Sequence, residues 1–288
     1  MKYVFGGNIF DAAESILTLN PSSGNFSYIW SIISYLYDSV CVPIGMGLVL
    51  IYFTVNIIEK STQQQNIDIE HVIKLLMKLF LGLYFVEHGL EILGSIYSLG
   101  LSFVSDILGT LKHNITFSQK LTAWAMLTGE EWSGVSWGVN DIGKAMATLI
   151  VTFIMFLLSW IMTAIVTCIC YFRMIEFYVR TALAPIALSD FFTEGVHGNG
   201  WRFIKSYIAV ALQGGVIMLI LVVYNALGAA VAPELDGVYT DIIDGGWDFI
   251  KYGLNLIVYL GEMLALSIAA IGLMIKSLSL TKEIVGVN

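Results

Sequence analysis

Residues 145–172 read AMATLIVTFIMFLLSWIMTAIVTCICYF and contain no charged side chain over twenty-eight positions. As a helix this run would rise about 42 Å, which exceeds the roughly 30 Å hydrocarbon core of a bilayer. A second apolar run, Tyr207–Ala232, follows after a connection that holds Arg173, Arg180 and Arg202. The stretch therefore predicts two membrane-spanning helices joined by a short basic connection.

The composition of the whole chain is typical of a membrane protein. Of its 288 residues, 57% are hydrophobic and 12% are charged, and the mean hydropathy is +0.80; soluble domains carry about 25% charged residues. The formal net charge of −8 argues against a basic groove for nucleic acid, because phosphate binding needs clustered Lys and Arg. Cys41, Cys168 and Cys170 lie in apolar runs, which favours small core residues over disulfides or metal ligands.

Five apolar runs predict an all-α, polytopic integral membrane protein with about five transmembrane helices and short interfacial helices. The spans are expected at residues 28–58, 72–108, 145–178, 207–232 and 249–275. They form a membrane domain, 28–278, preceded by an external interfacial segment, 1–27, and followed by a cytoplasmic tail, 279–288. The second span is the least hydrophobic because it includes Lys74 and Lys78, and a soluble amphipathic helix is the alternative there.

The first twenty residues predict a helix that lies in the membrane interface. Asn8 is placed to cap this helix, and acidic residues occupy the face opposite its apolar side chains. The apolar face consists of Ile9, Phe10, Ala13, Ile16 and Leu17. Short interfacial helices are also expected around Trp124, Trp132 and Trp137, since tryptophan is enriched at the level of the headgroups.

The basic residues predict the orientation of the chain. Nine of the fourteen Lys and Arg lie on one side of the predicted membrane, in the first-to-second and third-to-fourth connections and at the C-terminus. Basic loops favour the cytoplasm, so the C-terminus is expected in the cytoplasm and the N-terminus outside. Five spans also require ends on opposite sides of the cytoplasmic membrane.

The sequence carries no signature of an enzyme. It lacks a His-Glu-x-x-His zinc motif, a Gly-x-Ser-x-Gly nucleophile, a Walker A loop and a Cys-x-x-Cys pair. Its four histidines, at positions 71, 88, 113 and 197, are scattered. A non-enzymatic protein without a cofactor or a metal ion is therefore expected.

A charged strip follows the third span. Arg173, Glu176 and Arg180 are spaced by three and four residues, so all three share one face of a helix. One interpretation is a solvated helix end with internal ion pairs, each worth only tenths of a kcal/mol. The other is a docking surface for a cytoplasmic partner, and the spacing alone does not separate the two.

The next segment predicts a helix break and a site of close packing. Pro185 has no amide donor and disfavours helix at Ala184, so the helix is expected to break there. Residues 186–192 are apolar enough to lie in the interface, and glycines at 195, 198 and 200 allow the chain to reverse. Gln213 beside Gly214 indicates close helix packing.

This segment also resembles a known family. The run RTALAPIALSDFF at 180–192 and the run WRFIKSYIAVALQG at 201–214 resemble the hallmark of the TrbL-type (VirB-like) channel subunit of type IV secretion systems, in the versions carried by Gram-positive conjugative elements. The resemblance covers about thirty-five residues closely, and only the five-span topology beyond them. Its residues are Ala182, Ala184, Pro185, Ile186, Asp190, Phe191, Phe192, Lys205, Tyr207, Ala209, Gln213 and Gly214.

The resemblance implies a subunit of a conjugative DNA-transfer machine, in its channel or its assembly platform. Expected partners are other membrane subunits and the ATPases of the machine, and an oligomer is expected because some relatives form rings. The contacts with partners are expected from the charged strip together with Pro185, Asp190, Lys205, Gln213 and Gly214. The acidic balance makes direct contact with DNA an open question.

A second hypothesis is a small secondary transporter or a proton-coupled carrier. Its support is three carboxylates within predicted spans, Glu87, Glu91 and Glu262, because intramembrane carboxylates often act in proton relays. The inverted repeats that would favour a carrier are not visible in the sequence. Glu262 lies beside a small-residue ridge of Gly261, Ala265 and Ala269, and so is expected to face protein or water.

Overall fold

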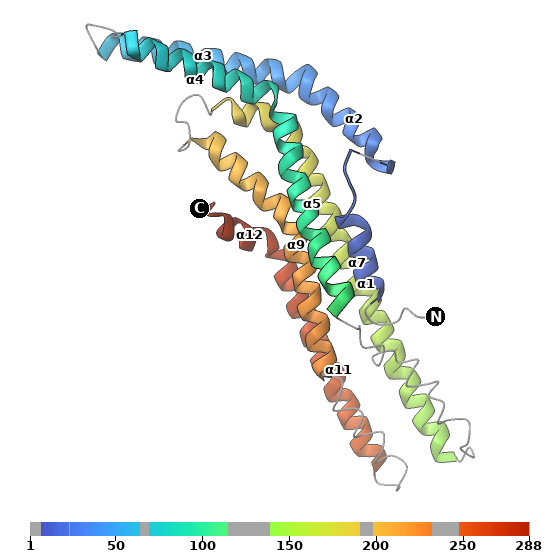
Figure 1. The fold of residues 1–288 in the computed structure, drawn as a ribbon. Helices are drawn as coiled ribbons and strands as arrows, with labels where there is room; N and C mark the ends of the chain where they lie inside the picture. Colours follow the sequence, from blue (N-terminus) through green and yellow to red (C-terminus); the bar gives the residue numbers. More distant parts are fainter. Residues whose placement is uncertain are drawn as a thin grey trace. The chain divides into compact units, whose positions relative to one another are not determined.

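The computed structural model describes residues 7–22, 24–63, 69–114, 139–190, 198–231 and 248–287. Every regular element among these residues is a helix, which confirms the predicted all-α class (Figure 1). The helices are α1 (Gly7–Leu17), η1 (Gly24–Phe26), α2 (Ser27–Leu36), η2 (Tyr37–Cys41), α3 (Val42–Gln63), α4 (Ile69–Glu87), α5 (Gly89–Asn114), α7 (Val139–Leu188), α9 (Asn199–Val231), α11 (Asp248–Ile275) and α12 (Ser277–Val285). The tryptophan-rich segment around positions 124, 132 and 137 lies outside the described residues.

The chain folds as two compact units. One unit contains residues 18–104, 171–215 and 278–288, and we call it the motif unit because it holds the 180–214 segment. The other contains residues 1–17, 105–170 and 216–277, and we call it the companion unit. Helices α5, α7 and α9 each contribute to both units.

Long apolar helices confirm a multi-pass membrane protein. Among the residues that the structure describes, four candidate spans are long and apolar enough to cross a bilayer: Ser27–Glu59, Gly89–Thr110, Leu157–Leu188 and Asn199–Gly228. The pair Gly261–Ile275 and Ser277–Val285 supplies a fifth when it is counted as one broken span. The predicted second span, 72–108, differs from the structure, because the helix breaks at His88. Of the two helices that result, α5 is long and apolar enough to cross a bilayer and α4 is not among the candidate spans.

In the companion unit, described side chains of α11 pack against α9. The hydroxyl oxygens of Tyr224 and Ser267 lie 3.2 Å apart, and Ser267 also donates to the carbonyl of Met263. A Cβ at Gly228 would lie at ordinary van der Waals distance, 3.7 Å, from the end of the Met263 side chain. The buried side chains of α11 repeat at the intervals of a helix packing seam, at Met263, Ser267, Ala270 and Met274.

The apolar face predicted for the N-terminal helix is confirmed. Its five members, Ile9, Phe10, Ala13, Ile16 and Leu17, are all buried in the folded chain. Protein therefore covers the face that the sequence pattern assigned to the membrane interface. The cysteines follow their prediction in part, since Cys41 and Cys170 are buried whereas Cys168 is exposed.

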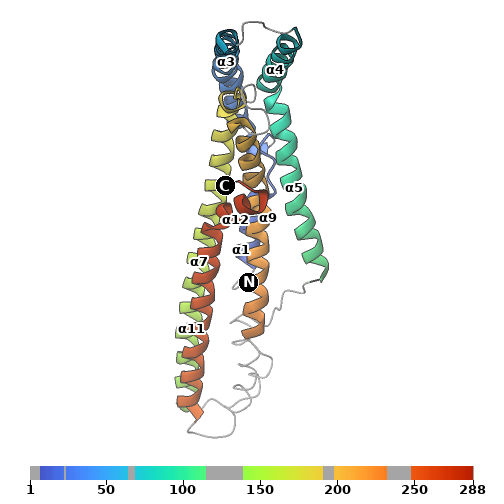
Figure 2. The same ribbon diagram turned by 90° about the vertical axis from the view of Figure 1, so that its left-hand side faces the viewer.

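The core of the motif unit is formed by three helical segments: the start of α5, the end of α7 and the start of α9. Segments α2 and η2 cross this core, with the ring of Trp30 stacked on Phe177 at a centroid distance of 6.5 Å. Tyr178 donates from its hydroxyl to the carbonyl of Pro21. Helices α3 and α4 pack against each other as a hairpin and leave the core sideways (Figures 1 and 2).

The predicted helix break at Ala184 and Pro185 is wrong. Helix α7 continues through Pro185 to Leu188, and the Ser189 amide donates to the Pro185 carbonyl at 3.1 Å. The reason is tertiary packing, because α3 lies directly on this turn: a Cβ at Gly45 would be 2.7 Å from the Pro185 oxygen. Neighbouring helices make an interior proline tolerable in membrane helices. The expected interfacial segment is therefore helical as far as Leu188, and residues 191–197 lie outside the described part.

Candidate functional site

Arg173 lies inside the motif unit and is 2% exposed. Its Nε donates to the carbonyl of Val210 at 3.1 Å, and its Nη2 donates to the carbonyl of Ala211 at 3.0 Å. A buried guanidinium is costly unless its donors are satisfied, so these main-chain acceptors on α9 offset the loss of water. Arg173 thus joins α7 to α9, and its side chain is too buried to belong to the docking surface that was predicted to include it.

Gly214 makes room for this arginine. A Cβ at Gly214 would lie 2.7 Å from both Cζ and Nη1 of Arg173, closer than real side chains approach. Gln213, next to it, is 6% exposed and belongs to the same buried layer. The close packing predicted at Gln213 and Gly214 is therefore present, and its partner is the arginine of the charged strip.

Helix α5 completes the layer around the guanidinium. The Cζ of Arg173 lies 5.8 Å from the centroid of the Tyr97 ring, within the range of a cation–π contact. The Tyr97 ring in turn packs on Phe177 at a centroid distance of 4.0 Å. A Cβ at Gly100 would overlap the Ala211 carbonyl, which shows that the backbones of α5 and α9 touch there.

About two turns beyond Arg173 along α7, a hydroxyl pair continues the polar layer. The oxygens of Thr181 and Tyr207 are 3.0 Å apart, and both side chains are buried. Thr181 also lies 2.9 Å from the Phe177 carbonyl, to which its hydroxyl donates. Because Thr181 on α7 and Tyr207 on α9 hydrogen-bond to each other inside the core, they favour one register between the two helices.

The other two members of the charged strip form the predicted ion pair. Arg180 donates from Nε and Nη2 to one oxygen of Glu176, at 2.9 and 2.6 Å. Its Nη1 donates to the Ser206 hydroxyl at 2.6 Å, so this pair also bridges α7 and α9. The two charged side chains are 22% and 32% exposed, and they are the part of the strip that a partner can reach.

The remaining residues of the motif hold the ends of helices. An Asp190 carboxylate oxygen accepts from the Asn199 amide at 2.9 Å, at the start of α9. Lys205 Nζ donates to the Gly286 carbonyl at 3.4 Å, which ties α9 to the chain after α12. Pro185 is buried against α3, as described above. The Asp190 contact therefore stabilises the connection between α7 and α9, and the Lys205 contact holds the C-terminal end of the chain against α9.

The three carboxylates of the carrier hypothesis are placed in two units. Glu87 and Glu91 are exposed on either side of the break at His88, and one oxygen of Glu91 is 4.0 Å from the Nδ1 of that histidine. Glu262 is exposed on α11 in the companion unit. The described residues contain no group of three His, Cys, Asp or Glu side chains that is able to hold a metal ion.

Sequence reasoning missed the partners of Arg173 on α5. Tyr97 and Gly100 stand three residues apart in an ordinary apolar run, and no local pattern separates them from lipid-facing residues. Tyr207 was quoted as part of the motif but without its bond to Thr181. The burial of Arg173 was missed as well, because its spacing to Glu176 and Arg180 is also that of a solvated helix face.

Comparison with known proteins gives one result. Residues 11–185 match the family model described as TrbL/VirB6 plasmid conjugal transfer like protein, which covers more than half of the chain. No curated protein and no solved structure matches the sequence. The match confirms the TrbL-type resemblance, and it ends at Pro185, so the half of the motif in α9 lies beyond it.

Proposed function

Because the chain belongs to the TrbL/VirB6 plasmid conjugal transfer like family, we propose that it is a non-enzymatic subunit of the channel or assembly platform of a type IV secretion machine. The family match and the apolar helices support a multi-pass membrane component of a conjugal transfer complex. The proposal adds that its role is to hold other subunits in place and that it performs no catalysis.

The observation that carries this proposal is the polar layer around Arg173. The side chains of this layer hold α5, α7 and α9 against one another. The Arg173 guanidinium donates to backbone carbonyls of α9, and Gly100 and Gly214 allow the helices to approach closely. A catalytic or transport site needs polar groups that face a substrate. A three-helix core whose buried arginine bonds to backbone suits a platform on which other subunits assemble.

Partners are proposed at the end of α7 and the start of α9. This region offers the half-exposed Glu176 and Arg180, together with Asp190 and Lys205. The basic residues of the connection favour the cytoplasmic side, and the same rule places the C-terminus there. Cytoplasmic ATPases and neighbouring membrane subunits of the machine are the proposed partners. An outside N-terminus requires in addition that residues 28–58 cross the membrane.

The test compares Arg173→Lys with Arg173→Met in a donor strain that lacks the native gene. Lysine keeps the charge but does not reproduce the geometry of two N–H donors to adjacent carbonyls. We expect both variants to reach the membrane, with reduced recovery of the assembled complex and reduced DNA transfer to recipients. Full transfer by Arg173→Met would contradict the proposed role of this layer.

A further inference from the structure

The hairpin of α3 and α4 carries an apolar surface that the described part of the chain leaves uncovered. Between positions 50 and 81, none of the described side chains is buried. The large exposed apolar residues are Leu50, Ile51, Val55, Ile57, Ile58, Ile69, Val72, Ile73, Leu76, Met77, Phe80 and Leu81. A surface of this kind is covered by lipid or by another protein.

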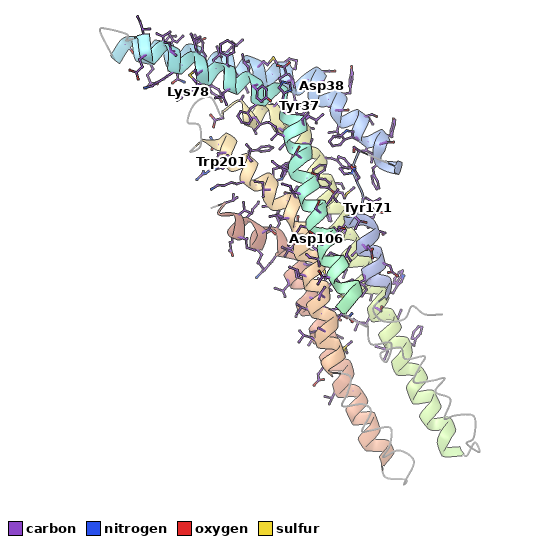
Figure 3. The ribbon with its side chains drawn as sticks, in the orientation of Figure 1. Tyr37, Asp38, Lys78, Asp106, Tyr171 and Trp201 are labelled. Atoms are coloured by element: carbon purple, nitrogen blue, oxygen red, sulfur yellow. The ribbon has the colours of Figure 1, made fainter. Side chains whose placement is uncertain are left out.

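The hairpin begins at a corner where α4 ends and α5 starts, beside the π-helical turn η2. The Tyr37 hydroxyl of the π-helical turn η2 donates to the Val86 carbonyl at 3.0 Å (Tyr37 is labelled in Figure 3). At Gly89, where α5 starts, a Cβ would meet both the Tyr37 hydroxyl and the Leu188 side chain. The corner is therefore tightly packed, and it fixes the direction in which the hairpin leaves the core.

That direction is sideways. In Figure 1 α4 runs across the page and α5 turns down it, and in Figure 2 α3 and α4 are seen nearly end-on while α5 still runs along the page. Since α5 is itself a candidate span, a hairpin at this angle to it lies along the surface of the bilayer that α5 crosses. The hairpin lies on the surface of the bilayer where α7 ends, because Leu188, the last residue of α7, packs against Gly89 at the same corner.

The side chains of α4 fit such a surface. Ile69, Ile73, Leu76, Phe80 and Tyr84 follow each other at intervals of three and four residues, so they form one exposed apolar face. Two lysines stand to one side of this face: Lys74, which pairs with Glu70 at 2.7 Å, and the exposed Lys78. An apolar face flanked by lysines is typical of helices that lie on anionic membranes.

We propose that the α3–α4 hairpin lies in the headgroup layer of the membrane, on the side where α7 ends, with its apolar face among the acyl chains and Lys74 and Lys78 among anionic lipid headgroups. The proposal rests on the membrane location of the chain and not on its role in transfer. It replaces the expected crossing at residues 28–58. The crossings then number four, and the N-terminus lies on the same side as the C-terminus.

The test measures depth along α4 in the full-length protein. Single cysteines for nitroxide labels are placed at Ile73, Leu76, Phe80 and Tyr84, after Cys41, Cys168 and Cys170 are replaced by alanine. The protein is reconstituted in nanodiscs of phosphatidylglycerol and phosphatidylcholine, and collision with oxygen and with a water-soluble nickel chelate gives the depth. A label at the exposed Ile175 of α7, thirteen residues before Leu188 and so about 20 Å from it along the helix, is the reference for a deep, membrane-spanning position.

The proposal predicts that all four labels lie at one shallow depth, about 5–10 Å inside the headgroup boundary. A depth that changes along the four labels, either rising steadily from Ile73 to Tyr84 or passing through a maximum between them, would show a crossing helix and overturn it. High exposure of all four labels to the nickel chelate would overturn it too, and would assign the surface to a protein partner. Reporters at the two chain ends give a second arm, since opposite sides would also contradict the proposal.

A double variant tests whether the charges of Lys74 and Lys78 hold the hairpin on anionic lipid. Lys74→Glu combined with Lys78→Glu is expected to raise the nickel exposure of the Phe80 label in discs that contain phosphatidylglycerol, and to leave it unchanged in pure phosphatidylcholine. Lys282→Glu on α12 serves as the control for a change of charge elsewhere. An unchanged Phe80 signal in the anionic discs would show that the lysines do not contact the headgroups.

Discussion

At the residue scale, α7 and α9 are joined by one buried arginine and the glycine that faces it. Arg173 is held by two carbonyls of α9, and Gly214 leaves space for its guanidinium. Each depends on the other, since the arginine without its acceptors would be a buried charge and a larger side chain at position 214 would displace it. This pair lends itself to a quantitative test.

Gly214→Ala is expected to lower stability by about 1–3 kcal/mol, because the added methyl group overpacks the core. The atoms that it meets belong to the flexible end of Arg173, so part of the strain is relieved by movement. Thermal unfolding of the purified protein in detergent measures the loss. Gly94→Ala is the matched control, since a Cβ there has nothing within 4 Å, and equal melting temperatures for both variants would contradict the account.

Glu262 is a residue-scale prediction of a different kind. It is exposed on a membrane helix, and an ionised carboxylate at mid-span costs about 2.5–3.5 kcal/mol on insertion scales, so it is expected to face another protein or water once the complex forms. Glu262→Gln keeps a hydrogen-bonding group and is expected to preserve assembly and transfer better than Glu262→Leu. Parental assembly and transfer by Glu262→Leu would show that this position faces nothing of importance.

At the element scale, the packing of α3 on α7 explains why an interior proline does not end the helix. Gly45→Ala would bring a Cβ to 2.7 Å from the Pro185 oxygen, which is a backbone atom, whereas at Gly214 the neighbour is the end of a side chain. Backbone yields less readily, so Gly45→Ala is expected to destabilise more than Gly214→Ala. Melting temperatures decide, with Gly47→Ala, which meets open space, as the control.

The start of α9 offers a second test at this scale. Asp190 accepts from the Asn199 amide, and removal of such a cap costs about 0.5–2 kcal/mol. Asp190→Ala is therefore expected to lower the melting temperature and to reduce DNA transfer, while Asp190→Asn, which keeps an acceptor oxygen, is expected to have a smaller effect. Transfer frequency and unfolding are measured on the same variants, and an unaffected Asp190→Ala would leave this segment as a simple connector.

The elements also show how far sequence reasoning reaches. Helices were predictable because long apolar runs have few alternatives in a bilayer, and the buried face of α1 followed from its spacing. The course of α7 past Pro185 was not predictable, because it depends on Gly45, 140 positions earlier in the chain. The break at His88 was hidden for a similar reason: the Tyr37 hydroxyl that holds it lies 49 positions before Val86, and the apolar runs on both sides of Glu87 and Glu91 together have the length of a span.

At the scale of the whole molecule, the distribution of basic residues predicts which connections face the cytoplasm. Reporter fusions after Gln65 and Gly195 are expected to give cytoplasmic signals, and fusions after Glu131 and Asp236 external ones. This pattern is common to the five-crossing and four-crossing topologies, because they place the four fusion sites on the same sides and differ in the course of residues 28–87. A cytoplasmic signal at Glu131 would contradict both.

The central claim is that the chain is a required component of a conjugal transfer machine. Its most direct test is the frequency of DNA transfer from a donor in which this gene alone has been deleted. We predict that transfer is lost, that the intact gene supplied in trans restores it, and that the Arg173→Met variant restores it only partly. Normal transfer from the deletion strain would contradict the claim.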